Sequence, residues 1–309
     1  MDHDHRVEGA VERMRIAAKF ATGLISVGMV ALMAAPAAAG PDAGSGSAAV
    51  PTGGTIEPSI DCTPDSAHPR PVVVLPGADG TVTDTAAQWS TMLTTLREAG
   101  YCAFLFQGGV ISGNRWSGDI PSAAQQVADF VNKVRWTTGT DQVDLVAHSA
   151  GTIVGNYFLK VLGGAPAVAR AVLLTPEVRG CDGAGFLGAY GIKNSPISPV
   201  QVVSALPFLG TVLAVIAPDK ANLVQLMPSS PVYQAVFDGQ VTQPGVRYSV
   251  LSTRNDELAT PATVCTNLTE AGVNMNFYED LFPSAAPVGH SSLRSSPDTA
   301  NWVVQQLDS

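Results

Sequence analysis

From residue 70 onward, short apolar runs alternate with segments whose hydrophobic residues recur at helical spacing. The apolar runs are 71–75 (PVVVL), 101–106 (YCAFLF), 142–147 (QVDLVA), 168–174 (VARAVLL) and 246–252 (VRYSVLS). The first of them, 71–75, is a continuous β-branched run, which is typical of a strand covered on both faces, and the others are strand-like. The alternation therefore predicts an α/β fold with a mostly parallel central sheet flanked by helices.

The segments between these runs have the i, i+3, i+4, i+7 pattern of amphipathic helices. One helix is predicted by Trp89, Met92, Leu93 and Leu96, with Asp84 or Thr85 as its cap and Gly100 as its stop. A second is predicted after Ser122 by Val127, Phe130, Val131 and Val134, and a third begins near Gly151. In such a fold, chemistry gathers at the carboxyl ends of the strands.

Length and charge limit the class of protein. The 309 residues are 46% hydrophobic and 14% charged, which predicts one enzyme-sized domain, over 59–309. The net charge of -9 argues against nucleic acid as a partner.

The first 39 residues have the layout of a secretory signal peptide. Basic residues up to Lys19 precede the uncharged run FATGLISVGMVALMAAPAAA, and Ala37 and Ala39 flank a cleavage point before Gly40. The alternative is a membrane-anchored helix, but no charged stop-transfer cluster follows the run. Residues 40–58 are rich in Gly, Ser, Ala and Pro and predict a flexible tail. We therefore expect a secreted or cell-envelope protein without a stable membrane span.

Four cysteines lie beyond the signal segment, an even number for an oxidising compartment. Three pairings are possible. We favour Cys62–Cys102 with Cys181–Cys265, because each pair then joins neighbouring parts of the alternating fold. No metal site is expected, because neither a Cys-x-x-Cys motif nor clustered His accompanies the cysteines.

Ser149 follows the run 142–147 and precedes a predicted helix. The pattern small-x-Ser-x-Gly on a strand-to-helix turn is the nucleophile elbow, in which small residues two before and two after the serine allow a tight turn. Ala147 and Gly151 fill those positions, and no other serine in the chain satisfies the pattern. The alternative is that Ser149 only caps the helix.

A serine nucleophile needs a base, almost always histidine. Three histidines lie beyond the signal segment. His148 is adjacent in the elbow and should point away from Ser149, and His68 precedes the first core strand, which leaves His290.

An acid must orient the histidine. The acids between the serine and His290 are Glu177, Asp182, Asp219, Asp238, Asp256, Glu257, Glu270, Glu279 and Asp280. We favour Asp256, because it follows a strand at its carboxyl end, with Glu257 as the alternative.

The oxyanion formed during such a reaction needs backbone donors. One should be the amide of Ala150, directly after the nucleophile. The second is predicted to be the amide of Ala78, in the loop LPGADG (75–80), where Gly77 lets the backbone turn in. The same loop could equally be a plain Gly-rich turn.

The chain resembles the secreted bacterial triacylglycerol lipases of the class 2 lipase family. The resemblance runs from about 69 to 293, through PRPVVVLPGADGT, GYCAFLF, VDLVAHSAGTIVGNYFLKVLGG, SSPVYQAVFDGQVTQPGVRYSVLSTRNDELATP and VGHSSL. It implies an α/β-hydrolase fold, no cofactor, and the triad Ser149, Asp256 and His290. Family members usually have His-Gly where this chain has Pro76-Gly77, which puts the conformation of that loop in question.

Residues 183–235 interrupt the alternation and contain an eighteen-residue stretch without charge, 200–217. Two interpretations are open: a buried helix pair broken at Pro207, or an apolar cap or lid beside the active site. A second segment, the loop 107–120, follows another strand end, so that Trp116 could line the substrate pocket.

These observations predict a secreted serine carboxylic-ester hydrolase, best described as a lipase, that acts on a lipid or other ester substrate through an acyl-enzyme. An envelope acyltransferase, or a general esterase or polyester hydrolase, would use the same triad. A non-catalytic binding scaffold is a further alternative, and its marker would be a missing triad residue.

Overall fold

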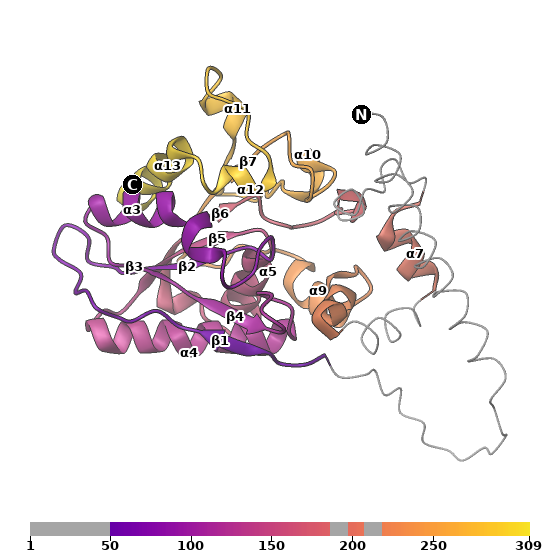
Figure 1. Ribbon diagram of the computed structural model, residues 1–309, viewed down its shortest axis with the longest axis horizontal. Coiled ribbons are helices and arrows are strands. Elements are labelled where there is room, and N and C mark those ends of the chain that lie inside the picture. The colour runs from indigo at the N-terminus through magenta and orange to yellow at the C-terminus, as the bar shows by residue number, and fades with distance from the viewer. Residues whose placement is uncertain (1–49, 186–196, 207–217) are drawn as a thin grey trace, which may run out of the picture. The chain divides into compact units, whose positions relative to one another are not determined.

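The computed structural model of the chain describes residues 50–185, 197–206 and 218–309 (Figure 1). The chain divides into two units, Met1–Gly46 and Ser47–Ser309, and every described residue belongs to the second. The predicted signal peptide therefore lies outside the described residues. No helix in the described ranges is long and apolar enough to cross a membrane.

The second unit is built on a parallel sheet of six strands in the part of the chain that the structure describes. Its order is β3-β2-β5-β6-β7-β8, and every neighbouring pair is parallel. The strands are β2 (Val72–Leu75), β3 (Ala103–Leu105), β5 (Val143–His148), β6 (Val168–Leu174), β7 (Arg247–Ser252) and β8 (Asn274–Phe277). This confirms the predicted α/β class with its parallel sheet. Because all strands run the same way, the loops after β2, β5, β6 and β7 meet at one edge of the sheet.

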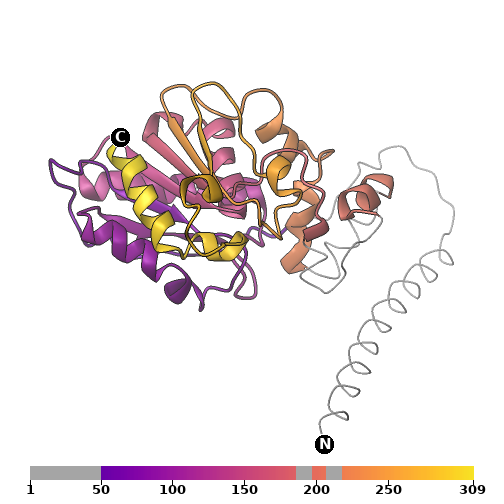
Figure 2. The same ribbon diagram turned by 90° about the horizontal axis from the view of Figure 1, so that it is seen from above.

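Helices cover both faces of the sheet, as Figures 1 and 2 show. On one face, α3 (Ser90–Glu98) packs against α13 (Pro297–Asp308), over a core that includes Trp89, Met92 and Trp302. On the other face lie α4 (Ile120–Thr138), α5 (Ala150–Asn156) and the π-helical turn η1 (Tyr157–Val161). Their core includes Phe104, Phe130 and Leu145. The residues predicted to face the core from the first two helices are those that do so.

The ends of α4 follow from local chemistry. The Asp119 carboxylate accepts a hydrogen bond from the Ser122 amide at 2.9 Å, so Asp119, rather than Ser122, caps the helix. Pro121 stands in the first turn, where its missing N–H costs nothing. Gly139 ends the helix with a φ of 68°, a left-handed conformation that favours glycine.

The segment 40–58, predicted to be a flexible tail, is ordered over its second half. β1 (Gly54–Ile56) pairs antiparallel with β4 (Gln107–Val110). The Asp119 amide also donates to the Pro51 carbonyl at 2.7 Å. The tail prediction is therefore wrong for this part: β4, which follows the second apolar run (101–106), offers a strand edge that a polar segment without its own apolar period completes.

The described residues of the predicted cap, 183–235, include α7 (Pro199–Ala205), the 3₁₀ helix η3 (Pro218–Leu226) and the start of α9 (Pro231–Phe237). Pro207, at which a helix pair was expected to break, lies outside the described residues. On the described part, Ile197, Val202 and Leu206 are exposed apolar side chains. In the chain, this segment lies between strands β6 and β7.

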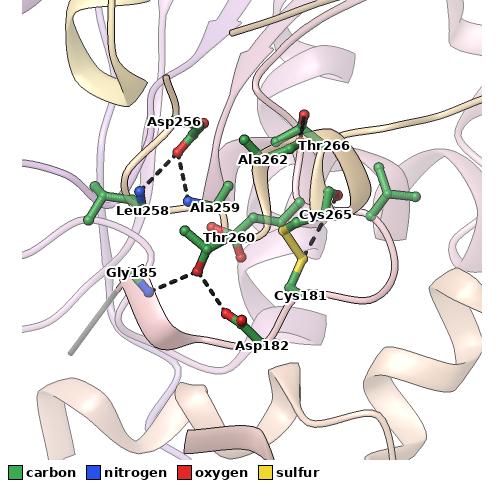
Figure 3. Close-up of a disulfide and its surroundings, with 12 residues drawn as sticks. Cys181, Asp182, Gly185, Asp256, Leu258, Ala259, Thr260, Ala262, Cys265 and Thr266 are labelled. Atoms are coloured by element: carbon green, nitrogen blue, oxygen red, sulfur yellow. Dashed lines mark hydrogen bonds between the residues drawn. A yellow bond between two sulfur atoms is a disulfide. The ribbon is translucent and has the colours of Figure 1, made fainter. Parts of the chain in front are cut away.

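Both favoured disulfides are present. Cys62 pairs with Cys102 and Cys181 pairs with Cys265, whose sulfurs lie 1.99 Å apart. Figure 3 shows the second disulfide beside the segment that leads from β6 into the cap. There Thr260 Oγ1 donates to Asp182 and accepts from the Gly185 amide, at 2.7 and 2.8 Å. The first residues of the cap region are therefore tied to the loop that follows β7.

Candidate active site

Ser149 stands at the turn between β5 and α5. Its φ and ψ of 50° and -129° lie in a region that non-glycine residues rarely occupy. This is the sharp strand-to-helix turn that the elbow pattern predicts. Gly151 has a further reason to be glycine: a Cβ there would lie 2.6 and 2.5 Å from the carbonyl oxygens of Leu75 and Pro76. The first turn of α5 therefore packs directly against the backbone at the end of β2.

His290 begins the short helix α12 (His290–Leu293) and lies between a serine and a carboxylate. Its Nε2 is 2.8 Å from Ser149 Oγ, and its Nδ1 is 2.8 Å from Asp256 Oδ2. All three side chains are buried. With Nδ1–H donating to Asp256, Nε2 carries the lone pair that can accept the serine proton. The structure thus brings together the three residues that the sequence predicted, in hydrogen-bonding order.

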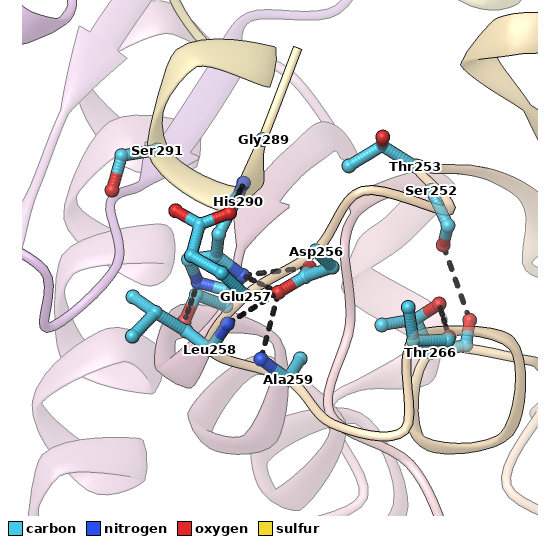
Figure 4. Close-up of polar contacts among 12 residues, drawn as sticks. Ser252, Thr253, Asp256, Glu257, Leu258, Ala259, Thr266, Gly289, His290 and Ser291 are labelled. Carbon is cyan, nitrogen blue, oxygen red and sulfur yellow. Dashed lines mark hydrogen bonds and ion pairs between the residues drawn. The ribbon is translucent and has the colours of Figure 1, made fainter. Parts of the chain in front are cut away.

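Asp256 is held by its own loop. Its Oδ1 accepts hydrogen bonds from the amides of Leu258 and Ala259 at 2.9 and 2.7 Å, as Figure 4 shows. Glu257, the alternative acid, instead accepts a hydrogen bond from the backbone amide of His290 at 3.1 Å. The two neighbours therefore face different parts of His290, and only Asp256 contacts the ring.

The charges around His290 favour its protonated form. Burial by itself disfavours the imidazolium, but the hydrogen bond and charge of Asp256 outweigh it, and Asp79 and Glu177 act in the same direction. The pKa of His290 is therefore raised above its usual value. A base with a raised pKa accepts the serine proton more readily, and it also becomes protonated at a higher pH.

Glu177 is a carboxyl group at the site to which the sequence assigned no role beyond that of a possible acid. It follows β6, and its Oε1 lies 3.4 Å from Ser149 Oγ. Burial, with the nearby Asp256 charge, raises its pKa, although His290 and the Ser149 hydroxyl oppose this. The available signal was its position just beyond the carboxyl end of the strand next to β5.

The loop after β2 approaches the nucleophile closely. A Cβ at Gly77 would lie 3.0 Å from Ser149 Cβ and 2.6 Å from His148 Nδ1, so only glycine fits. Within the described residues, the amides of Ala78 and Ala150 have no hydrogen-bond acceptor. Unused amides beside the nucleophile are what an oxyanion hole requires, and both predicted donors retain that capacity.

Trp116 lies behind this loop. Its side chain is 2% exposed and packs against Phe106, and its Nε1–H donates to the Pro76 carbonyl at 2.5 Å. The expectation that Trp116 lines the substrate pocket does not agree with this position, because the indole packs into the core beneath the loop. Pro76 stands where the resemblance led us to expect histidine, and its carbonyl is held from the far side by this indole.

His148 points away from Ser149, as the elbow geometry predicts. Its Nε2–H donates to the backbone carbonyl of His290 at 3.0 Å. Burial lowers the pKa of His148 to about 3, although the Asp79 charge opposes this. The His148 ring is therefore neutral at physiological pH, and its hydrogen bond holds the backbone of His290 in place.

Metal-binding groups are not clustered in the described part of the chain. No set of three or more His, Cys, Asp or Glu side chains there is arranged to hold a metal ion.

The parallel sheet flanked by helices, with the sharp turn after β5, has the α/β-hydrolase fold. Residues 69–180 match the family model of lipase (class 2), which confirms the resemblance over this part of the chain. A search of curated proteins gave no match.

Among solved structures, Aspergillus fumigatus lipase B superposes with a TM-score of 0.58 at 13% identity, over 89% of this chain and 63% of that one. This chain thus spans less than two thirds of the length of that lipase. Bacillus licheniformis lipase BlEst2 in its mature form gives a TM-score of 0.49 at 15% identity, over 82% of this chain and 97% of that one. At such identity, the likeness to lipase B shows the shared fold alone.

Proposed function

We propose that this protein is a secreted serine carboxylic-ester hydrolase, best described as a lipase, with Ser149 as nucleophile, His290 as base and Asp256 as the orienting acid. The observation that carries the proposal is the hydrogen-bonded chain from Asp256 through His290 to Ser149, with contacts of 2.8 Å on each side of the ring. A serine alone is a weak nucleophile, and this arrangement is the one that activates it.

The reaction follows from these contacts. His290 Nε2 takes the Ser149 proton as Oγ attacks the ester carbonyl, and the amides of Ala78 and Ala150 stabilise the resulting oxyanion. The imidazolium, paired with Asp256, then gives the proton to the leaving alcohol, which yields an acyl-enzyme. Water, deprotonated by His290, attacks the acyl group, and the collapse of the second tetrahedral species returns the proton to Ser149.

Two features support a lipid ester and export. Ile197, Val202 and Leu206 are exposed by 53%, 37% and 45%, and apolar groups exposed in this way favour an oil–water interface.

Two disulfides suit an oxidising compartment. Export is tested by N-terminal sequencing of the protein recovered from the culture medium or envelope, where we expect the chain to begin at Gly40.

The catalytic proposal is tested by labelling with a fluorophosphonate probe, followed by peptide mass spectrometry. We expect the label on Ser149, no label on Ser149→Ala, and full labelling of the control Ser90→Ala, at an exposed position of α3. Ester turnover should fall roughly 10⁶-fold in Ser149→Ala. Retention of more than a few per cent of the activity by that variant would refute the mechanism.

The substrate class is tested separately. We expect emulsified long-chain triacylglycerol to be cleaved faster than a soluble short-chain ester at equal ester concentration. The reverse ranking would favour a general esterase. Addition of an alcohol acceptor, with product analysis, distinguishes hydrolysis from acyl transfer: free acid should remain the main product.

A further inference from the structure

Arg115 is a fully buried arginine that contacts the loop after β2. It lies in the segment between β4 and α4, and its side chain is 0% exposed. Its Nε–H donates to the carbonyl oxygen of Gly77 at 2.9 Å. The Gly77 carbonyl and the Ala78 amide belong to the same peptide group, and in a trans peptide they point in opposite directions. A donor fixed on the carbonyl therefore sets where the amide points.

The Nη1 and Nη2 atoms of the guanidinium form hydrogen bonds to the same loop and to the short helix α2 (Thr85–Gln88) that follows it. Nη1 donates to the Thr81 carbonyl at 3.2 Å and contacts the Thr85 hydroxyl, and Nη2 donates to Gln88 Oε1 at 3.0 Å. Because the guanidinium is planar and rigid, these bonds fix its orientation together. The neighbouring Trp116 holds the Pro76 carbonyl, so two successive carbonyls of the loop are bound from behind.

Two carboxylates act on the Arg115 guanidinium. Asp84 attracts it at longer range, and Asp79 lies within ion-pair distance, 3.7 Å from Arg115 Nη2. Its other oxygen is 2.6 Å from both Arg294 Nη1 and the Ser291 hydroxyl. Two guanidiniums thus share one carboxylate, and His148 beside them is neutral. Burial lowers the pKa of Arg115 to about 10, which still leaves it charged at neutral pH.

We propose that Arg115 is the positioning residue of the oxyanion hole: it fixes the plane of the Gly77–Ala78 peptide and polarises the Ala78 amide through the shared carbonyl. The inference rests on the proposed function. A hydrogen bond accepted by a peptide carbonyl strengthens the donor at the other end of that peptide. A stronger Ala78 donor stabilises the negative charge that develops on the substrate oxygen. It therefore stabilises the transition state more than the bound ester.

The test compares Arg115→Met and Arg115→Lys with the control Arg70→Met. Arg70 is likewise paired with an aspartate, Asp144 at 3.0 Å, but it is only partly buried and precedes β2 at the opposite edge of the sheet. The measurements are kcat and KM for a soluble ester, affinity for a boronic acid that forms a tetrahedral adduct on serine, and the thermal midpoint. Fluorophosphonate labelling of the wild type establishes beforehand that Ser149 is active.

We expect Arg115→Met to lower kcat by at least 10-fold with KM within about 2-fold, since losing one oxyanion donor altogether costs about 10²–10³ in kcat. The boronic acid should lose affinity by a similar factor. Lysine keeps the charge but cannot reproduce the fork, so Arg115→Lys should show the same split to a lesser degree.

Three results would overturn the proposal. The first is an unchanged kcat in folded Arg115→Met, and the second is a change in KM alone. The third is unaltered affinity for the boronic acid in either variant. If Arg115→Met does not fold, Arg115→Lys decides by the same measurements. A wild type that neither labels nor hydrolyses esters would instead refute the proposed function.

Discussion

His148 Nε2 donates a hydrogen bond of 3.0 Å to the backbone carbonyl of His290, across 142 positions of sequence. The bond joins the elbow to the loop that carries the proposed base. It also requires His148 to be protonated on Nε2, which leaves this nitrogen unable to accept a proton.

The two histidines should therefore respond differently to substitution. His148→Phe keeps the ring but leaves the His290 carbonyl unsatisfied, so we expect a loss of about 1–3 kcal/mol in the free energy of unfolding. Fluorophosphonate labelling of this variant should be slower yet complete. His290→Ala should fold like the wild type and fail to label on the same timescale. Comparable labelling rates for the two variants would contradict the assignment of the base.

Asp256 and Glu257 provide a second matched pair. Asp256→Asn removes the charge that stabilises the imidazolium and disturbs its tautomer, so kcat should fall by roughly 10⁴-fold. Glu257→Gln retains an oxygen to accept the His290 amide, and its kcat should stay within about 3-fold of the wild type. Steady-state kinetics on a soluble ester measures both. Equal losses would show that the acid had been assigned to the wrong neighbour.

The dependence of kcat/KM on pH should reflect the raised pKa of His290. As pH falls through that pKa, the ring is protonated and cannot take the Ser149 proton, so the acid limb should lie above the ordinary histidine value near 6.5. Glu177→Gln removes a negative charge that favours the imidazolium. The pKa of His290 should then fall, and the limb should move to lower pH. Glu98→Gln, on exposed α3, is the control; a limb that stays in place or moves upward would rule out this coupling.

Gly151 and Gly155 lie one turn apart on α5 and face different neighbours. A Cβ at Gly151 would meet backbone oxygens at 2.5 and 2.6 Å, whereas at Gly155 it would meet the ends of two leucine side chains at 3.3 and 3.5 Å. Gly151→Ala should therefore push α5 from β2, costing about 1–3 kcal/mol of stability and most of the activity. Gly155→Ala should change the thermal midpoint little, since better helix propensity offsets tighter packing. Calorimetry with ester assays checks both.

The central strands and the order of the proposed triad could be predicted because their signals are local. β5, β6 and β7 are short, mostly buried runs rich in apolar residues, and Ser149 lies in a short pattern whose small residues have a steric cause. β8 could not be recognised: its sequence NMNF is half polar, and it lies at the edge of the sheet with intermediate burial.

The side chains that surround the proposed triad could not be predicted from local sequence patterns, because their contacts depend on tertiary structure. Arg115 and Arg294 are charged residues, which are almost always exposed, and both have buried side chains beside Asp79, which distant segments bring to them. Glu177 is likewise placed beside Ser149 by the register of β6 on β5. Such contacts depend on tertiary structure, so the periodicity of the sequence does not predict them.

The predicted cap region is joined to the loop after β7 by a disulfide and a hydrogen bond. This connection separates changes that affect the range of substrates from changes that affect proton transfer. The Cys181–Cys265 disulfide and the Asp182–Thr260 hydrogen bond hold the entry to the cap on the same loop that orients Asp256. Among the described residues, the hydrogen-bond partners of Asp256 are His290, Leu258 and Ala259, and none of them comes from α7, η3 or α9. The substrates that such an enzyme accepts can therefore diversify through the insertion while the machinery of proton transfer is inherited unaltered.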